Sequence, residues 1–186
     1  MKKYISVLTL LLLLFFTYNF LKSPPAIFLA KIQKTRLNFL IHYEWDVSAA
    51  KDGSVTACMK EDDHKLTLYI SGSGKMIDFD DNHKIAWNNM KNMTTGWNYK
   101  LEKLVIEKDV KSIGYCAFAS QSNIEQVVIP SSVLEIGDYA FYNDNSLKNI
   151  SFSGTIKEWN KVSYKKNTFS GIATEIVHCS DGDKEL

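Results

Sequence analysis

The sequence predicts a β-rich solenoid in which coils of about 23 residues each contribute one strand to a parallel sheet. Three observations support this prediction. The phrase SIGYCAF at residues 112–118 returns almost unchanged as EIGDYAF at residues 135–141. Short runs with alternating apolar residues precede both phrases. The chain of 186 residues is 45% hydrophobic, so it can supply the core that stacked coils need.

Residues 1–22 are predicted to form a hydrophobic leader helix, either a signal peptide or a retained signal anchor. Two lysines precede a leucine-rich run at 5–16, which is the pattern of an export signal. No small residues mark a cleavage site before the prolines at 24–25. A run that continues to Leu21 is just long enough to span a bilayer with strain, so the anchor stays an alternative.

Residues 23–44 are predicted to be a basic and apolar linker or an amphipathic segment. They hold Lys31, Lys34 and Arg36, and no acid precedes Glu44. This composition is compatible with contact with an anionic membrane surface. An ordinary linker, or a helix packed on the domain, fits it equally well. We therefore expect any membrane contact to be made through residues 1–43.

Residues 45–100 are predicted to be a β cap followed by a connector. Two β-prone runs, at 55–57 and 65–70, flank the polar stretch KEDDHK, which indicates a hairpin. The terminal coil of a solenoid needs such a cover, because it would otherwise expose apolar core and a strand edge.

Two segments match no column of the repeat. The connector at 78–100 is expected to be irregular, with Trp87 and Trp97 covering the first coil. At the other end, residues 180–186 are expected to be a polar tail.

The repeats occupy residues 101–179. Residues 101–123 align without gaps on residues 124–146, with the identical pairs Glu102/Glu125, Val105/Val128, Ile106/Ile129, Val110/Val133, Ile113/Ile136, Gly114/Gly137, Ala117/Ala140 and Phe118/Phe141. A third, degenerate copy at 147–169 keeps Ile150, Phe152, Ile156, Trp159 and Tyr164 in the apolar columns. Residues 170–179 are expected to form a closing strand in which Ile176 points inward.

Each copy is expected to form one coil. In the first strand, Leu104 and Ile106 point to one side because strand side chains alternate. In the second copy Pro130 ends the strand, and Gly114 and Gly137 are expected to give the backbone freedom for a later bend. A single copy buries too little apolar surface to offset the entropy of ordering its backbone, so the coils must stack.

The pattern LxxLxI, then Val, then IGxxAF resembles the BspA-type leucine-rich repeat of bacterial surface and secreted proteins. Residues 45–76 are similar to the β segment that often precedes such arrays, and SGTIKEWNKVSY followed by TEIVHCSDG is similar to their closing repeat. The resemblance implies a leucine-rich-repeat solenoid in a protein that is secreted or tethered to the outer face of the cell membrane. It also implies adhesion to host proteins or to other cells.

Charge and cysteine content exclude several classes. Residues 44–186 hold 16 basic and 21 acidic residues, so this part is net negative and lacks the footprint of a nucleic-acid-binding protein. Cys58, Cys116 and Cys179 form no CxxC pair, which excludes a disulfide-dense scaffold and a zinc finger. We expect the three thiols to pack as small apolar groups.

No motif indicates an enzyme, a metal or a cofactor. SGSGK at 71–75 lacks the first glycine and the final Ser or Thr of a phosphate-binding loop, which favours a tight turn. Two polar clusters, Asp78, Asp80, Asp81 and His83, and Asp62, Asp63 and His64, are interpreted as solvated loops, because the first fits no calcium loop and the second lies at the expected hairpin tip. His178 and Cys179 are strand neighbours that point to opposite faces, so they cannot act as a base and a nucleophile.

A binding surface remains, on the outer face of the predicted sheet. Alternation turns outward the side chains of Lys103, Val105, Glu107, Gln126, Val128, Pro130, Asn149, Ser151 and Ser153. Solenoids usually bind their partners on such a face, and we expect a protein or a cell-surface macromolecule there. The alternatives are a structural spacer without a tight ligand, in which the valines only favour β structure, or a truncated member of a longer family.

Overall fold

The computed structural model describes residues 44–62, 65–80 and 100–186. These residues all belong to one compact unit, which spans Leu40–Leu186. The predictions for the leader, for residues 23–43, and for Trp87 and Trp97 lie outside the described residues. The helices that are described are too short and too polar to cross a membrane.

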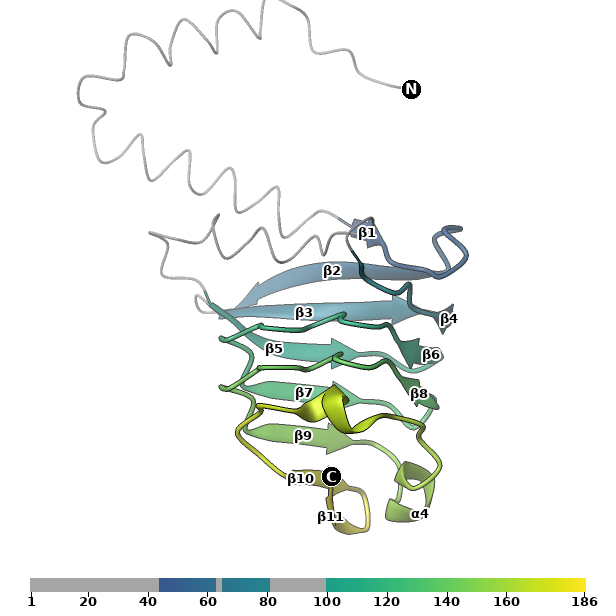
Figure 1. Cartoon of the computed structure of the whole chain (residues 1–186). Helices are drawn as coiled ribbons and strands as arrows, with labels where there is room; N and C mark the ends of the chain where they lie inside the picture. Colours follow the sequence, from purple (N-terminus) through teal and green to yellow (C-terminus); the bar gives the residue numbers. More distant parts are fainter. Residues whose placement is uncertain (1–43, 63–64, 81–99) are drawn as a thin grey trace, which may run out of the picture. The chain divides into compact units, whose positions relative to one another are not determined.

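The described strands form two sheets that run side by side (Figure 1). The larger sheet has eight described strands, in the order β1 (Glu44–Asp46), β2 (Val55–Asp62), β3 (Lys65–Gly72), β5 (Lys100–Ile106), β7 (Gln126–Ile129), β9 (Asn149–Phe152), β10 (Ile176–Cys179) and β11 (Gly182–Glu185). The smaller sheet contains β4 (Gly74–Lys75), β6 (Val110–Ile113) and β8 (Glu135–Ile136). A short helix, α4 (Ile156–Trp159), and a 3-10 turn, η2 (Lys166–Phe169), follow β9.

Parallel pairing between successive coils confirms the repeat that the sequence predicts. Leu104 of β5 pairs with Val127 of β7, and Val127 pairs with Ile150 of β9, a step of 23 residues each time. All three side chains are buried. Phe118 and Phe141 are also buried, and their rings stack with centroids 5.5 Å apart. The coils therefore share one interior, and each strand presents its alternate residues to it.

The two repeat glycines serve a purpose other than the predicted bend. Neither Gly114 nor Gly137 has a positive φ. A Cβ on Gly114 would overlap with the carbonyl oxygen of Ile77, and one on Gly137 would overlap with the backbone nitrogen of Tyr115. Glycine is required here because the backbones of neighbouring coils touch at these positions.

The left-handed bends of each coil are made by other residues. Cys116 and Tyr139 have φ values of 53° and 58°, and Ser120 and Asn143 both have a φ of 60°. Each pair is separated by one repeat, so the same two positions bend in both coils. Beside these bends, backbone N–H groups of one coil donate to carbonyl oxygens of the next coil. The Phe118 N–H, for example, donates to the carbonyl oxygen of Ala140 at 2.8 Å.

The third coil is longer than the gapless alignment predicts. Ser112 pairs with Glu135 at a separation of 23 residues, whereas Glu135 bridges to Ser163 at a separation of 28. Phe169 therefore continues the aromatic stack, with its ring 5.5 Å from that of Phe141. The predicted register, which places Tyr164 in the apolar column of Phe118 and Phe141, is wrong. The extra residues form α4, where Ile156 is half-buried and Trp159 is buried.

The closing strand, β10, does not point the predicted side chains inward. Val177 pairs with Ile150 and is fully buried, whereas Ile176 is 38% exposed. Ile176 and Val177 are adjacent apolar residues, so alternation alone does not choose between them, and the register with β9 decides. The residues expected to be only a polar tail form β11, which pairs antiparallel with β10.

At the other end, β2 and β3 form an antiparallel ladder from the pair Val55 and Gly72 to the pair Asp62 and Lys65. The residues between these strands, 63–64, lie outside the described ranges. β3 then pairs in parallel with β5, with Leu68 opposite Leu104. The ladder thus continues the repeat sheet, and its inner residues Leu66, Leu68 and Ile70 are buried.

The SGSGK stretch forms the tight turn that the sequence predicts. β3 ends at Gly72 and β4 begins at Gly74, and both glycines have positive φ values, of 112° and 128°. A Cβ on Gly72 would overlap with the carbonyl oxygen of Ser54. The turn therefore needs glycine for its own geometry, and no phosphate has to be invoked.

Candidate functional site

The outer face of the large sheet carries one continuous row of side chains, which we name the central row. Successive register pairs join Cys58 to Tyr69, Tyr69 to Val105, Val105 to Val128, Val128 to Ser151, Ser151 to His178 and His178 to Asp183. Every member is half-buried or exposed, whereas the residues on either side of it in β3, β5, β7 and β9 are buried. The row crosses seven strands and is apolar in its middle.

The seven residues predicted to bind a partner all lie on or beside this row. Val105, Val128 and Ser151 belong to the central row itself. Lys103, Gln126 and Asn149 are in register with one another and form a neighbouring polar row. Glu107 follows the end of β5 and is exposed.

Pro130, which was also expected to point outward, is buried. The strand ends at Ile129, and the carbonyl oxygen of Pro130 accepts the N–H of Val133 at 3.1 Å in a turn toward the interior. Ser153, by contrast, is exposed, and its hydroxyl oxygen accepts the N–H of Ser131 at 2.9 Å.

A groove of about 420 Å³ opens at the polar row, between the hairpin and the first repeats. Lys60 and Thr67 of the hairpin line it together with Lys103 and Gln126 of the repeats. Tyr69 lies beside them, with the Lys60 ammonium 4.4 Å from the centre of its ring.

The two carboxylates that line this groove, Glu102 and Glu125, each form an ion pair. Lys65 lies 3.0 Å from Glu102, and Lys148 lies 3.6 Å from Glu125. The pairs are partly exposed, so each contributes little to stability. Their effect on the groove is to neutralise its two carboxylates.

Sequence reasoning missed Lys60, Thr67 and Tyr69 as part of the face. The three residues belong to the hairpin, which was interpreted only as an end cover. The strand parity of β3 was visible in the alternation of Leu66, Leu68 and Ile70, and this signal already turns Thr67 and Tyr69 outward. The repeat period does not predict the register between the hairpin and the repeats.

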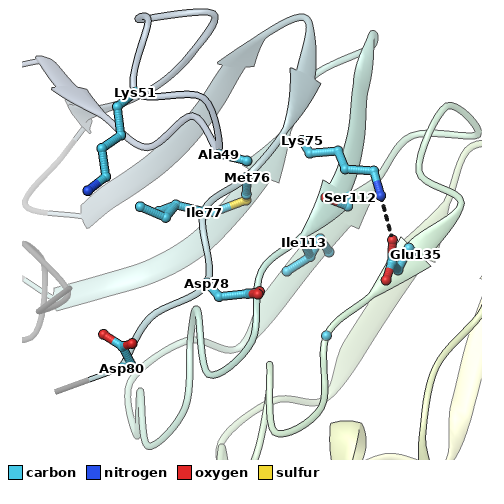
Figure 2. A pocket seen from close by; sticks show the side chains of 11 residues that line it. Ala49, Lys51, Lys75, Met76, Ile77, Asp78, Asp80, Ser112, Ile113 and Glu135 are labelled. Carbon is cyan, nitrogen blue, oxygen red and sulfur yellow. Dashed lines mark hydrogen bonds and ion pairs between the residues drawn. The ribbon is translucent and has the colours of Figure 1, made fainter. Parts of the chain in front are cut away.

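A second cavity, of about 390 Å³, lies beside the small sheet (Figure 2). Lys75 and Glu135 form an ion pair of 3.0 Å across it, as the dashed line shows. Asp78 also lines the cavity, and its carboxylate accepts the N–H of Tyr115 at 2.7 Å. Asp78 thus anchors the first coil, while Asp81 and His83 of the same predicted cluster lie outside the described residues.

A metal or a reactive thiol finds no support in the described residues. No group of three or more His, Cys, Asp or Glu side chains there is placed to share a metal ion. All three cysteines are described, half-buried and free. Burial raises the pKa of the Cys58 and Cys179 thiols, which keeps both in the unreactive protonated form.

Comparison with known proteins identifies the repeat. Residues 93–175 match the family model described as "BspA type Leucine rich repeat region (6 copies)". The chain carries a BspA-type leucine-rich repeat region. A solved leucine-rich repeat protein from Eubacterium ventriosum is similar to it at 21% sequence identity with a TM-score of 0.48. That similarity covers 73% of this chain and 37% of the solved one. No curated protein matches the sequence.

Proteins with BspA-type repeats are typically bacterial surface proteins, and leucine-rich repeats generally bind other proteins without catalysing a reaction. One arrangement on this repeat sheet nevertheless has the residue types of a hydrolase. Ser151, His178 and Asp183 are consecutive in the central row, and the His178 Nδ1 atom lies 2.8 Å from the Asp183 carboxylate.

The geometry of these three residues does not support nucleophilic catalysis. The Ser151 hydroxyl donates to the side-chain oxygen of Asn149 at 3.0 Å, so its proton is directed away from a base. The side chains of His178 and Asp183 are 44% and 62% exposed, so water has free access to them. Neither cavity described above is lined by these residues.

Proposed function

We propose that this protein is an exported, non-catalytic surface protein that binds a protein or another cell-surface macromolecule through the outer face of its large sheet. Adhesion to host proteins or to neighbouring cells is the function that this surface would serve. Export would be directed by residues 1–22, acting as a signal peptide or as a retained anchor.

One observation carries the proposal: the apolar middle of the central row is left on the surface. Tyr69, Val105 and Val128 are neighbours on three adjacent strands, and each is half-buried although it points away from the core. Polar residues border this strip on the outer face, two positions away along the strands: Thr67, Lys103 and Gln126 on one side, and Ser71 and Glu107 on the other. Apolar centres with polar rims are the usual form of protein-binding surfaces.

We further propose that the hairpin of β2 and β3 closes one end of the repeat array. Its inner residues Leu66, Leu68 and Ile70 are buried in line with those of β5. An uncovered first coil would expose that core and a strand edge. In this view the hairpin both ends the array and enlarges its binding face.

The experiment compares two double variants of the purified protein in binding to cells and to immobilised host surface proteins. V105E/V128E places two carboxylates on the apolar strip, and L134E/Y142E adds the same charge at exposed apolar residues elsewhere. We expect the first variant to lose binding at least about tenfold and the second to retain it. Both must show the circular dichroism spectrum of the parent protein.

The spacer alternative makes the opposite prediction. If V105E/V128E is folded and binds as well as the parent protein, the outer face is not the contact surface. The protein would then act as a structural module that holds another part of the chain at a distance.

A further inference from the structure

We infer that the groove at the polar row holds a carboxylate-bearing, extended segment of the protein partner. This inference rests on the proposed function and names the chemistry that one part of the binding face recognises. It is carried by the placement of Lys60 and Lys103 on either side of one strand.

The register places these two lysines symmetrically about Thr67. Lys60 of β2 pairs with Thr67 of β3, and Thr67 pairs with Lys103 of β5. Neighbouring strands lie about 4.8 Å apart, so the backbones at the two lysines are roughly 10 Å apart. Lysine side chains are long enough for both ammonium groups to reach one carboxylate placed above the Thr67 hydroxyl.

The groove has cationic groups that the described part of the protein does not neutralise. Its acids, Glu102 and Glu125, are already paired with Lys65 and Lys148. Neither Lys60 nor Lys103 forms an ion pair with a described residue, and the Lys60 ammonium lies over the ring of Tyr69. The aromatic ring holds the Lys60 ammonium over the groove without cancelling its charge.

Further groups in the groove suit a peptide. The Gln126 side chain and the Thr67 hydroxyl, which form no hydrogen bond within the described residues, line the groove beside the two lysines. An amide and a hydroxyl both donate and accept hydrogen bonds, as the backbone of an extended segment requires. A volume of about 420 Å³ holds a few residues of such a segment and excludes a folded domain.

The net charge of residues 44–186 selects against polyanions. Residues 44–186 hold 16 basic and 21 acidic residues, so the long-range field repels nucleic acid and sulfated polysaccharide. Two lysines suffice for isolated carboxylates, whose binding depends on short-range contact. A protein segment with isolated carboxylates is therefore the occupant that the two lysines attract and that the long-range field repels least.

The test measures the fluorescence anisotropy of a short labelled peptide in which Glu alternates with Thr, with a Gln-Thr peptide of the same length as control. The full chain is compared with K60Q/K103Q and with K157Q/K161Q, which removes two exposed lysines elsewhere. We expect the Glu-Thr peptide to bind more tightly than the Gln-Thr peptide. We expect K60Q/K103Q alone to weaken that binding about fivefold to thirtyfold, and added salt to do the same.

Three results would overturn the inference. The two peptides binding equally would show that the groove does not recognise carboxylates. Equal losses in both lysine variants would show a general effect of charge. A short oligonucleotide or sulfated oligosaccharide that binds more tightly than the peptide, with the same dependence on Lys60 and Lys103, would assign the groove to polyanions. In each of these cases a loss of cell binding in V105E/V128E would leave the proposed function standing.

Discussion

Among single residues, Asp144 stands out because its carboxyl group lies inside the stack. The side chain is fully buried, and one of its oxygens accepts the N–H of Gln121 from the preceding coil at 2.6 Å. The other oxygen has no hydrogen-bond partner among the described residues. Burial raises the pKa of Asp144 to about 7, and the hydrogen bond from Gln121 opposes this shift only in part.

Asp144 should make the protein less stable as pH rises. Between about pH 4 and pH 7 the folded state keeps the Asp144 proton, which the unfolded chain has released, so the unfolding free energy falls across this range. We expect D144N to remove this dependence and to be more stable than the parent protein by about 2–4 kcal/mol at pH 8, with a smaller difference at pH 4. Urea denaturation at both pH values measures the effect.

Glu175 is an exposed carboxylate and provides the matched control. E175Q should leave the difference between the two pH values unchanged. A D144N variant that is destabilised equally at pH 4 and pH 8 would mean that the carboxylate is stabilised inside the stack, contrary to this account.

Gly137 gives a second prediction for a single residue. A methyl group there would meet backbone atoms of Tyr115 and Gly114, which cannot rotate away as a side chain can. We expect G137A to lower the unfolding free energy by about 3 kcal/mol or more, measured by urea denaturation. G53A is the control, because no atom lies near a Cβ at Gly53, although its φ of 74° adds a modest strain.

Among the elements, α4 depends on its capping residues. The Thr155 hydroxyl accepts the N–H of Glu158 at 3.3 Å, and the Glu158 carboxylate accepts the N–H of Thr155 at 2.7 Å. Asp181, next to β11, accepts the N–H of Ile156 at 2.7 Å. A helix of one turn has almost no stability of its own, so these bonds hold the insertion that covers Phe152 with Trp159.

We expect T155A to lower the unfolding free energy by about 1 kcal/mol at neutral pH. Hydrogen bonds from the backbone N–H and the hydroxyl of Thr155 lower the pKa of Glu158, and T155A removes only the bond from the hydroxyl. The contribution of that bond is present above the ordinary pKa of a glutamate and is lost as pH falls through the lowered value. Thermal denaturation at pH 7 and pH 3 should therefore show a smaller effect of T155A at the lower pH. An effect of T155A that does not change with pH would mean that the lost stability comes only from the bond that the Thr155 hydroxyl accepts from the Glu158 N–H.

The elements also show how far the sequence predicts this fold. The alternation in LVI at 104–106 and in VVI at 127–129 predicts which side chains of β5 and β7 point into the core. The repeat period predicts that these two strands pair. β8 has only two residues, too few to alternate, so the small sheet was not predicted. The capping-box signature Thr-x-x-Glu at 155–158 indicates the start of α4. The gapless alignment left no room for a helix there, so α4 was not predicted.

The alternation and the period also predict part of the candidate site. Val105, Val128 and Ser151 follow from the alternation and the period together. Lys60 and Thr67 join them only through the register of an antiparallel ladder, which is set by strand pairing and lies outside the repeat. A periodic sequence predicts the neighbours within its array and leaves open what pairs with the first strand.

At the scale of the whole molecule, a column of stacked aromatic rings joins the coils. Phe141 lies between Phe118 and Phe169, with ring centroids 5.5 Å away on both sides. Phe169 also contacts Trp159 and Tyr164, which close the third coil. Since each coil buries its ring against the next, the stack is expected to unfold as one unit.

We expect F141A to lower the unfolding free energy by about 3–5 kcal/mol, because it removes a fully buried ring with a neighbour on each side. F169A should have a smaller effect, because Phe169 is half-buried and stacks on only one phenylalanine. Urea denaturation followed by far-ultraviolet circular dichroism and by tryptophan fluorescence should give coincident transitions for both variants. Separate transitions by the two probes in F141A would mean that the coils are independent and that the central ring does not couple them.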